Sequence, residues 1–360
     1  MTREVRIGGR IVGDGAPCFV TFEAGATHAG VDSAKRLVDI AASAGADAIK
    51  FQILDPDRLV ADRAQPFSYQ VLVDRASGAR ETVTEPLYDL LKRRALGADQ
   101  WRAVKTHADR LGLAFFATAG FPEEVDMLAA MGCDSIKIAS ADIDHFPLIR
   151  HAARTGLCLQ IDTGSATLGE VEAAVDVIRA EGNERIVIHH CPTGYPAKTE
   201  AINLRVIGTL RAMFACPIAY SDHTPSHAMD VAALALGANL LEKTITEDRT
   251  TRGIEHIMSL EPHEARGFIE TIREVETAFG GPRRTFDAPE RERRRAVRRS
   301  IHLAAPARYG ARLADTALDF RRPGFGLSPA FLDRHGDARL ARDLPAGHRL
   351  DLGDLTTEDR

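Results

Sequence analysis

The chain contains 360 residues, of which 44% are hydrophobic and 27% are charged, and its formal net charge is −5. This composition is that of an ordinary globular protein, and the negative charge argues against a general nucleic-acid binder. No apolar run approaches the roughly 20 residues of a membrane-spanning helix, and the polar N-terminus does not resemble a signal peptide. We therefore expect a cytoplasmic protein that binds neither nucleic acid nor membrane.

The cysteines show no CxxC spacing and mostly stand in or beside apolar segments. They are Cys18, Cys133, Cys158, Cys191 and Cys216. Isolated cysteines in apolar segments behave as small hydrophobic residues, and disulfides are rare in the cytoplasm. We therefore predict that all of them are buried, reduced thiols.

Short apolar runs alternate with helix-like segments along most of the chain. Residues 4–13 come first and predict a hairpin that turns at Gly8 and Gly9. The apolar runs that predict strands are 18–22, 48–51, 113–117, 135–139, 157–161, 186–188, 218–220 and 239–241. The segments that predict helices are 34–44, 98–111, 123–131, 147–155, 168–180, 204–214, 227–236 and 262–279.

Eight strands that are each followed by a helix predict a (β/α)8 barrel. A doubly wound sheet is the alternative, but no GxGxxG motif follows the first strand. The segment 55–85 is too long for a simple connection, so we expect either a lid or an insertion with its own hairpin. We predict the barrel over residues 1–280, a Pro/Gly/Arg-rich linker over 281–299 and a small β-rich domain over 300–360.

Polar side chains follow several of the predicted strands. Ser221, Asp222 and His223 come after one strand, and Glu242 and Lys243 come after the next. Because the carboxyl ends of parallel strands meet at one rim of a barrel, such residues are expected to share a site.

A repeated pattern places a lysine at the end of three strands. Residues 44–50, 131–137 and 236–243 each combine a helix end, a glycine and an apolar strand that closes in Lys50, Lys137 or Lys243. This repeat predicts three ammonium groups at the rim, which suits a phosphate. Carboxylates and histidines from the other strand ends suit proton transfer and metal binding. The rim therefore indicates an enzyme that handles a phosphorylated anion, with or without a divalent metal.

Seven short motifs in register identify a family that the chain resembles. They read FEAGATHAG, AGADAIKFQ, IKIASAD, HHCPTGYPAK, YSDHT, LEKTITEDRT and RRPGFGLSP, and together they cover nearly the whole sequence. In this order they are similar to the sialic acid synthase family, whose members condense phosphoenolpyruvate with an N-acetylated amino sugar. The resemblance implies a (β/α)8 barrel followed by an antifreeze-like (SAF) domain in a domain-swapped homodimer.

The resemblance also implies roles for individual residues. The phosphate and carboxylate of phosphoenolpyruvate would meet Lys50, Lys137, Ser140 and Ser221, and Glu23, Asp142 and Glu242 match the catalytic acidic positions. On the sugar side stand Gln52, Tyr195, Glu255 and Arg322, the last of which would reach across the dimer. His223 matches one of two histidines that bind a divalent cation, Mn²⁺ or Mg²⁺.

The chain departs from the family pattern around the metal and the acceptor. Thr244 stands where the family has its second metal histidine, and a hydroxyl is a poor substitute for imidazole. We name His256 as the candidate replacement, with an ordinary rim histidine as the alternative. Asp162 stands where the family has a serine that faces phosphate, so we expect it to turn toward the acceptor, a metal or a lysine.

These departures leave alternatives open. The first expectation is a nonulosonic acid product from an amino-sugar aldehyde, and the second is the same condensation on another aldehyde in sugar or nucleoside metabolism. A Schiff-base aldolase would use Lys137 or Lys243 covalently. A barrel that has lost catalysis and serves binding or assembly is the non-enzymatic alternative.

Overall fold

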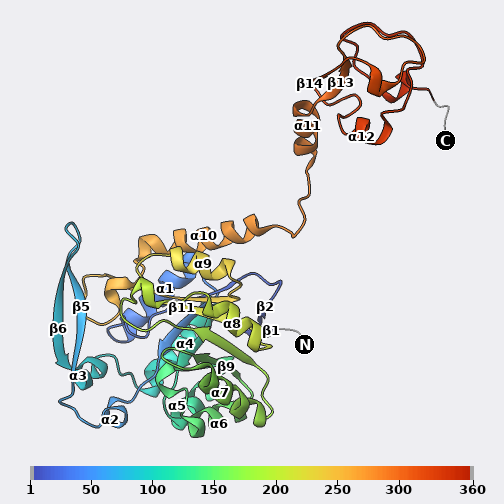
Figure 1. The fold of residues 1–360 in the computed structure, drawn as a ribbon. Coiled ribbons are helices and arrows are strands. Elements are labelled where there is room, and N and C mark those ends of the chain that lie inside the picture. The colour runs from blue at the N-terminus through green and yellow to red at the C-terminus, as the bar shows by residue number, and fades with distance from the viewer. Residues whose placement is uncertain (1–3, 357–360) are drawn as a thin grey trace. The chain divides into compact units, whose positions relative to one another are not determined.

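The computed structural model describes residues 4–356 and divides the chain into two compact units between Gly280 and Gly281. In the described part of the first unit, eight parallel strands close into a barrel in the order β10-β11-β12-β3-β4-β7-β8-β9. Helices surround these strands, as Figure 1 shows. The predicted (β/α)8 barrel is therefore confirmed.

The barrel strands are β3 (Phe19–Glu23), β4 (Ala48–Gln52), β7 (Ala114–Thr118), β8 (Ser135–Ile138), β9 (Cys158–Asp162), β10 (Ile186–His190), β11 (Ile218–Asp222) and β12 (Leu240–Thr244). The helices that cover them are α1 (Val31–Ala44), α4 (Ala98–Arg110), α5 (Pro122–Ala130), α6 (Phe146–Arg154), α7 (Leu168–Ala180), α8 (Val206–Met213), α9 (Ala228–Ala235) and α10 (Pro262–Phe279).

Most barrel strands extend further than their apolar runs. Strand β11 continues through Ser221 to Asp222, and β12 continues through Glu242 and Lys243 to Thr244. Successive side chains of a strand point to opposite faces of the sheet. Polar residues that we predicted beyond the strand ends are therefore divided between the barrel interior and the layer under the helices.

The N-terminal hairpin packs against the amino-terminal end of the barrel. It consists of β1 (Glu4–Ile7) and β2 (Arg10–Gly13), joined at Gly8 and Gly9 with positive φ angles of 55° and 78°, as a tight two-residue turn requires. Val5, Ile7 and Val12 form one apolar cluster with inward-facing strand residues such as Phe19 and Phe116. The base of the barrel is therefore apolar, and the polar side chains gather at its other end.

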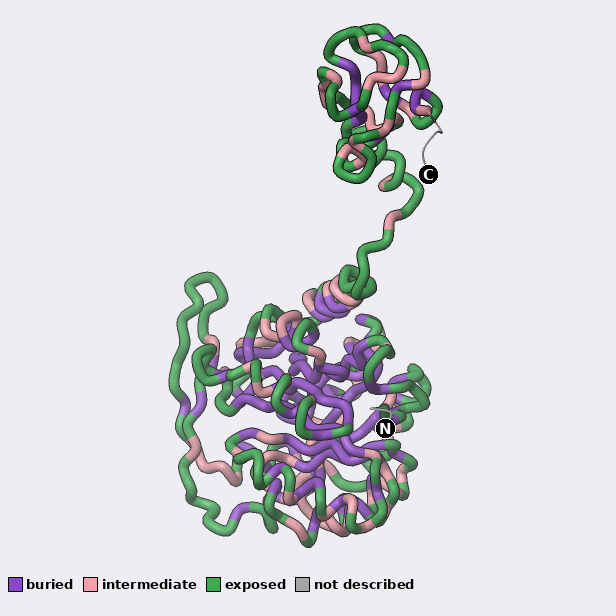
Figure 2. Tube along the Cα trace, turned by 45° about the vertical axis from the view of Figure 1, so that its right-hand side comes forward, coloured by how far each residue is buried: buried purple, intermediate pink, exposed green. Residues whose placement is uncertain are grey.

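The long segment after β4 is an insertion with its own hairpin. It contains α2 (Pro56–Leu59), β5 (Pro66–Asp74), β6 (Ala79–Pro86) and α3 (Leu87–Lys92). The hairpin is largely exposed along its length, in contrast to the buried barrel strands (Figure 2). Tyr69, Val71 and Val83 anchor its base against Leu90 and Ile254.

The second unit has a small apolar core of its own, which includes Ile301, Leu303 and Leu340. It comprises α11 (Ala288–Val297), β13 (Ser300–Leu303), β14 (Leu318–Arg321), α12 (Phe331–His335) and short 3-10 turns. Helix α11 lies inside the segment that we predicted to be a plain linker. Much of the β structure consists of isolated bridges such as Ala307 with Leu344, because turns interrupt the strands.

The five cysteines are all buried and free, as predicted. No helix in residues 4–356 is long and apolar enough to cross a membrane.

Candidate active site

A cavity of about 280 Å³ lies at the carboxyl ends of the barrel strands. Many of the predicted site residues line it: Glu23, Lys50, Gln52, Ser140, Asp142, Tyr195, His223, Glu242 and Glu255. Asp162, which departs from the family pattern, and Thr118 at the end of β7 line it as well. Lys137 and Ser221 lie directly against these residues, inside the barrel. Arg322 belongs to the second unit, and its contact with an acceptor stays a prediction.

Two lysines and three carboxylates form the central network of the site. Lys50 Nζ lies 2.7 Å from Glu23 Oε2 and 3.4 Å from Glu242 Oε1. Lys137 Nζ lies 2.6 Å from Glu242 Oε1 and 3.0 Å from Asp162 Oδ1. Glu242 therefore bridges the two ammonium groups, and Asp162 faces a lysine, one of the three partners that we expected for it.

Strand register explains why these side chains meet. Glu23 is paired with Lys50 across β3 and β4, and Ser221 is paired with Glu242 across β11 and β12. The Ser221 hydroxyl lies 3.0 Å from Lys137 Nζ and 3.3 Å from Glu242 Oε1. Each of these positions points into the barrel, so the closed sheet brings residues from distant parts of the sequence into one cluster.

A chain of hydrogen bonds below the network holds Ser221 in place. His189 Nδ1 lies 2.9 Å from Ser221 Oγ, and His189 Nε2 lies 2.8 Å from Gln160 Oε1. Gln160 Nε2 in turn donates to Ser135 Oγ at 2.7 Å. Burial and the Lys137 charge lower the pKa of His189 well below its usual value, so the ring is neutral.

The charged groups of the network shift one another's pKa values. Burial would raise the pKa of Glu242, but the ammonium groups of Lys137 and Lys50 hold it below the ordinary carboxyl range. Burial raises the pKa values of Glu23 and Asp162. Burial would lower the pKa of Lys50, yet the Glu23 and Glu242 carboxylates raise it well above the usual lysine value. Lys50 is therefore a fixed cation that suits an anionic ligand.

Lys243 does not belong to this network, and our prediction of three ammonium groups at the rim is wrong for it. On β12, Glu242 points into the barrel, so Lys243 points outward. There it pairs with Asp222 and, at 3.3 Å, with Asp230 of α9. His190 is likewise turned outward, with Nε2 2.7 Å from the carbonyl oxygen of Ile202. The strand alternation that brings Glu242 into the site thus excludes Lys243.

His223 is arranged as a metal-binding histidine would be. Its Nδ1 donates to the carbonyl oxygen of Pro192 at 2.8 Å, and its ring lies 4.7 Å from that of Tyr195 between centroids. Metal-ligating histidines commonly donate their second nitrogen to a carbonyl in this manner, which leaves Nε2 as the ligand atom. Burial lowers the pKa of His223 to about 4, so the ring is neutral at physiological pH.

The remaining donors fit a hard divalent cation. Glu255, Glu23 and Asp142 line the same cavity as His223, and carboxylates with one imidazole suit Mn²⁺ or Mg²⁺. Burial and the Glu23 charge raise the pKa of Glu255 to about 7. Thr244 Oγ1 lies 3.5 Å from Glu255 Oε2, too long for a strong hydrogen bond. The site thus holds an excess of buried carboxylates that a divalent cation would neutralise.

The structure does not bring His256 to the cavity that His223 lines, so our choice of it as the replacement metal ligand is not supported. His256 is buried in the 3-10 turn η3 (His256–Met258), and its Nδ1 lies 2.7 Å from Thr246 Oγ1. The preceding residue, Glu255, takes the cavity-facing position instead. His256 is therefore a hydrogen-bonded structural residue.

The raised pKa of Glu255 predicts a pH-dependent stability. Below about pH 4.3, the pKa of glutamate in the unfolded chain, Glu255 is protonated in both the folded and the unfolded protein. Between pH 4.3 and about 7, the unfolded chain releases this proton but the folded protein keeps it. Stability is therefore lost as pH rises through this window, by up to roughly 4 kcal/mol. Urea unfolding of metal-free protein at pH 5 and pH 8 should show a smaller difference for Glu255→Gln than for the wild type. Identical differences would contradict the assignment.

Several residues of the site were missed from the sequence. Gln160 stands in an apolar strand, and a polar residue within a fully buried strand is itself a sign of an inward-facing functional position. Glu124 lines the cavity and accepts from the backbone N–H groups of Gly120 and Phe121 at 2.7 and 3.1 Å. Arg94 follows α3 and is buried near the site, but nothing in the local sequence indicates it.

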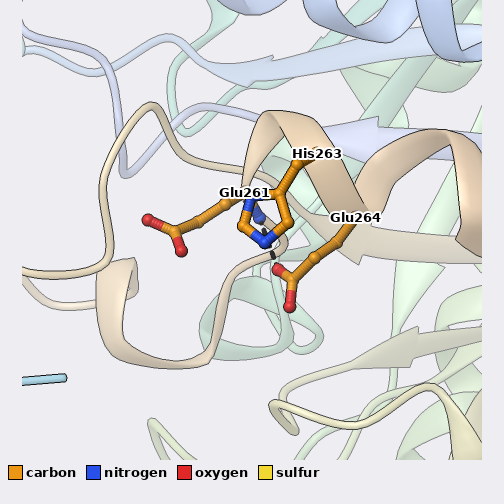
Figure 3. A group of neighbouring side chains, drawn as sticks. All are labelled: Glu261, His263 and Glu264. Atoms are coloured by element: carbon orange, nitrogen blue, oxygen red, sulfur yellow. Dashed lines mark hydrogen bonds between the residues drawn. The ribbon is translucent and has the colours of Figure 1, made fainter. Parts of the chain in front are cut away.

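A second cluster of possible ligands lies outside the cavity, at the start of α10 (Figure 3). The ligand atoms of Glu261, His263 and Glu264 lie within 4.8 Å of one another. Arg75 pairs with Glu261 at 2.5 Å, and Arg249 pairs with Glu264. Glu264 also accepts from the Glu261 backbone N–H at 2.9 Å. Because both carboxylates are already neutralised, we interpret this group as a helix cap.

Comparisons with known proteins agree with this fold and site. The NeuB family matches residues 37–284. An N,N'-diacetyllegionaminic acid synthase of Legionella pneumophila is 34% identical over 343 residues, which cover 94% of each chain. The N-acetylneuraminate-9-phosphate synthase of Homo sapiens is 32% identical over 76% of this chain and 74% of its own. The structure of an N-acetylneuraminic acid synthetase from Leptospira borgpetersenii matches with a TM-score of 0.70 and 29% identity, covering 81% of this chain and 95% of that one.

The fold and the site define a (β/α)8 enzyme with a cavity built for an anionic substrate. The chain belongs to the NeuB family, the sialic acid synthases. It is accordingly a phosphoenolpyruvate-dependent synthase.

Proposed function

We propose that this protein condenses phosphoenolpyruvate with an amino-sugar aldehyde and releases a nonulosonic, sialic-acid-like 2-keto-3-deoxy acid and phosphate, with cleavage of the C–O bond. The observation that carries this proposal is the central network, in which two buried lysines meet three carboxylates at the cavity. Relatives named as synthases of several different nonulosonic acids support the product class.

In this proposal the lysines bind the donor. Lys50 and Lys137 attract the phosphate and carboxylate of phosphoenolpyruvate, and the hydroxyls of Ser140 and Ser221 donate hydrogen bonds to them. Donor binding would then separate part of the present ion pairs, because each lysine is neutralised by a carboxylate in the free enzyme. Separation of these ion pairs costs free energy, and the attraction of the donor's anionic groups to the preorganised Lys50 and Lys137 charges would offset that cost.

The carbon chemistry follows from this placement. The methylene carbon of phosphoenolpyruvate attacks the aldehyde carbon, so a C–C bond forms and the aldehyde oxygen takes up a proton. Positive charge develops at C2 of the donor, where a nearby carboxylate such as Glu23 stabilises it. Water adds at C2 and gives up a proton to a carboxylate of the site. The C2–O bond then breaks and phosphate leaves with the electron pair, while the C2 hydroxyl gives up its proton to the departing phosphate or to a carboxylate of the site, so that a keto group remains.

His223 with Glu255 and neighbouring carboxylates would hold the divalent cation that the family resemblance implies. When bound, such a cation polarises an aldehyde oxygen. Thr244 supplies no imidazole, so we propose that the ligand set relies more on carboxylates and water than the family pattern does.

We propose a retained donor and leave the acceptor open. Thr244 and Asp162 depart from the family pattern on the acceptor and metal side, whereas Lys50, Lys137 and Ser221 match it. The favoured acceptor is an amino-sugar aldehyde, and the second candidate is another aldehyde from sugar or nucleoside metabolism.

Phosphate release from phosphoenolpyruvate, measured with a panel of aldehydes, tests the function. We expect release that depends on the aldehyde. Turnover of N-acetylmannosamine at ordinary rates would exclude an altered acceptor. An enzyme that releases phosphate with none of the aldehydes, while it remains folded and binds phosphoenolpyruvate, would favour the non-catalytic alternative.

We also propose a domain-swapped homodimer in which Arg322 of the antifreeze-like domain contacts the acceptor of the partner's site. Support comes from the RRPGFGLSP motif and from the separate core of the second unit. Truncation after Gly281 is expected to raise the KM of the acceptor several-fold more than that of phosphoenolpyruvate, as steady-state kinetics will show. Equal changes in the two KM values would count against this role and leave the domain as a dimerisation element.

A cytoplasmic location stays a prediction.

A further inference from the structure

A second pocket, of about 150 Å³, lies on the insertion side of the barrel and shares none of its lining residues with the catalytic cavity. Three arginines contribute to it: Arg93 and Arg94, which follow α3, and Arg252 in the loop after β12. His28 lies opposite, in the loop before α1. Of the described residues that line this pocket, none is an aspartate or a glutamate.

Two buried donors of this pocket have no acceptor. Arg94 is only 8% exposed and His28 only 3%, yet Arg94 Nε and His28 Nε2 lack a hydrogen-bond partner among the described residues. The backbone N–H of Gly30 lies 3.4 Å from His28 Nδ1, so this nitrogen is the acceptor and Nε2 carries the proton. The pocket thus presents two unmatched N–H groups, and a buried donor without an acceptor is unfavourable.

The arginines leave the pocket positively charged. Arg93 is neutralised by Glu85, with N···O distances of 2.7 and 2.8 Å. Neither Arg94 nor Arg252 forms an ion pair with a carboxylate in the described part of the chain. Arg94 also donates to the carbonyl oxygen of Gly25 at 3.4 Å, a weak contact that leaves most of its donors free. The carboxylates of Glu255 and Glu23 act on Arg94, and that of Glu85 acts on Arg252, but none lies within ion-pair distance. A neutral ligand such as water would satisfy the donors but would leave both arginines without a direct anionic partner.

We propose that this pocket is an oxyanion site that binds a phosphate or carboxylate group through Arg94, Arg252 and the Nε2–H of His28. An oxyanion supplies several acceptor atoms and the negative charge that the pocket lacks, and guanidinium groups match its geometry. The volume of the pocket is sufficient for one such group.

The site is placed to influence catalysis. Arg94 contacts the carbonyl of Gly25, and the N–H of Gly25 donates to Glu23 Oε1 at 2.8 Å. An anion bound at Arg94 is therefore linked through Gly25 to the Glu23 carboxylate of the catalytic cavity.

Inorganic phosphate is the probe for the first experiment, and Trp101 is the reporter. It is the only tryptophan of the chain, and its ring centroid lies 5.6 Å from that of His28. We expect phosphate to change its fluorescence in the wild type. Arg252→Ala, which removes an exposed side chain, should weaken phosphate binding at least tenfold, and Arg94→Gln should do the same. Arg110→Ala, at the exposed end of α4, should have no effect.

The catalytic cavity is a second place where phosphate could bind, so Lys137→Met separates the two. The fluorescence response should keep its phosphate dependence in Lys137→Met and should require at least tenfold more phosphate in Arg252→Ala. The reverse pattern, or unaltered phosphate affinity in Arg252→Ala, overturns the proposal. So does the absence of bound phosphate in equilibrium dialysis of the wild type at millimolar concentration. None of these measurements requires turnover, so they remain valid if the proposed function fails.

Kinetics then identify the source of the oxyanion, in an arm that rests on the proposed function. If the group is a substituent of the acceptor, Arg252→Ala raises the KM of an aldehyde that carries phosphate or carboxylate and leaves that of a neutral aldehyde unchanged. If the group is a free anion, added phosphate changes the wild-type rate with a neutral aldehyde, and Arg252→Ala abolishes this response.

Discussion

Replacement of Lys137 by methionine is expected to lower kcat for phosphate release by about 10²- to 10³-fold, the loss seen when one preorganised charge-stabilising group is removed. Lys137 is completely buried and contacts Glu242 at 2.6 Å, Asp162 at 3.0 Å and Ser221 at 3.0 Å. Methionine keeps the length of the side chain but removes the charge that would face the donor. Steady-state phosphate release, normalised to folded protein, measures the effect.

Lys243→Met is the matched control. Lys243 is 1% exposed and also pairs with two carboxylates, Asp222 and Asp230, but on the outer side of the barrel wall. Loss of a partner from a buried pair is expected to destabilise the protein by roughly 3 to 5 kcal/mol. The folded Lys243→Met enzyme should nevertheless retain kcat within about tenfold of the wild type, since only groups that act on the transition state change kcat. Equal loss of kcat in both variants would contradict the assignment of Lys137.

The same pair of lysines separates the synthase from a Schiff-base aldolase. A Schiff base needs a free, neutral amine. Lys137 Nζ is instead ion-paired with Glu242 at 2.6 Å and Asp162 at 3.0 Å, and the Lys243 side chain points out of the barrel, where it pairs with Asp222. Borohydride with pyruvate should therefore trap no adduct, and mass spectrometry that detects a stable one would overturn this view.

His223→Ala is expected to weaken Mn²⁺ binding by about 100-fold, whereas His256→Ala should leave it unchanged. The two histidines are well matched, because burial lowers the pKa of each to about 4 and both are neutral. They differ in position: His223 lines the cavity with Nδ1 engaged by Pro192, and His256 bonds Thr246 away from it. Replacement of a residue that only hydrogen-bonds to a metal ligand typically weakens metal binding 10- to 100-fold. Loss of the imidazole ligand itself should therefore weaken Mn²⁺ binding by at least the upper end of this range.

Electron paramagnetic resonance of free Mn²⁺ measures binding without any need for turnover. Thr244→His is an informative third variant, because Thr244 faces Glu255 within the site. If the ligand set relies on carboxylates as we propose, the added imidazole should strengthen Mn²⁺ binding. Weaker binding in His256→Ala than in His223→Ala would reinstate His256 as the ligand.

The barrel could be predicted from the sequence because its signal is local and repeated. Helices α7 and α10 have the predicted bounds, and every barrel strand begins within one residue of its apolar run. The strand ends were less predictable, because hydrophobicity alone marks only the apolar part of a strand. Since β12 continues to Thr244, its side chains alternate between the two faces of the sheet, and Lys243 points out of the barrel. The central network therefore contains two lysines, where we had predicted three at the rim.

Residues that reach the site from connections were the hardest to predict. Glu255 was found because it matches an acidic position of the family, whereas Arg94 follows a helix inside the insertion and has no neighbouring signal. Its position depends on how the β5–β6 hairpin packs against Ile254, a contact between segments more than 150 residues apart that no local pattern encodes. His256 was predicted to be a metal ligand because of its residue type. In the structure, the turn at η3 places Glu255, and not His256, at the cavity.

The most direct test of the proposed reaction uses phosphoenolpyruvate labelled with ¹⁸O in the bridging C–O–P position, together with an aldehyde that supports turnover. Cleavage of the C–O bond leaves this oxygen in the phosphate, so ³¹P NMR should show the isotope-shifted signal of labelled phosphate, and Lys137→Met should release far less of it. Unlabelled phosphate, with the label retained in the keto acid or lost to water, would show P–O cleavage and contradict the account.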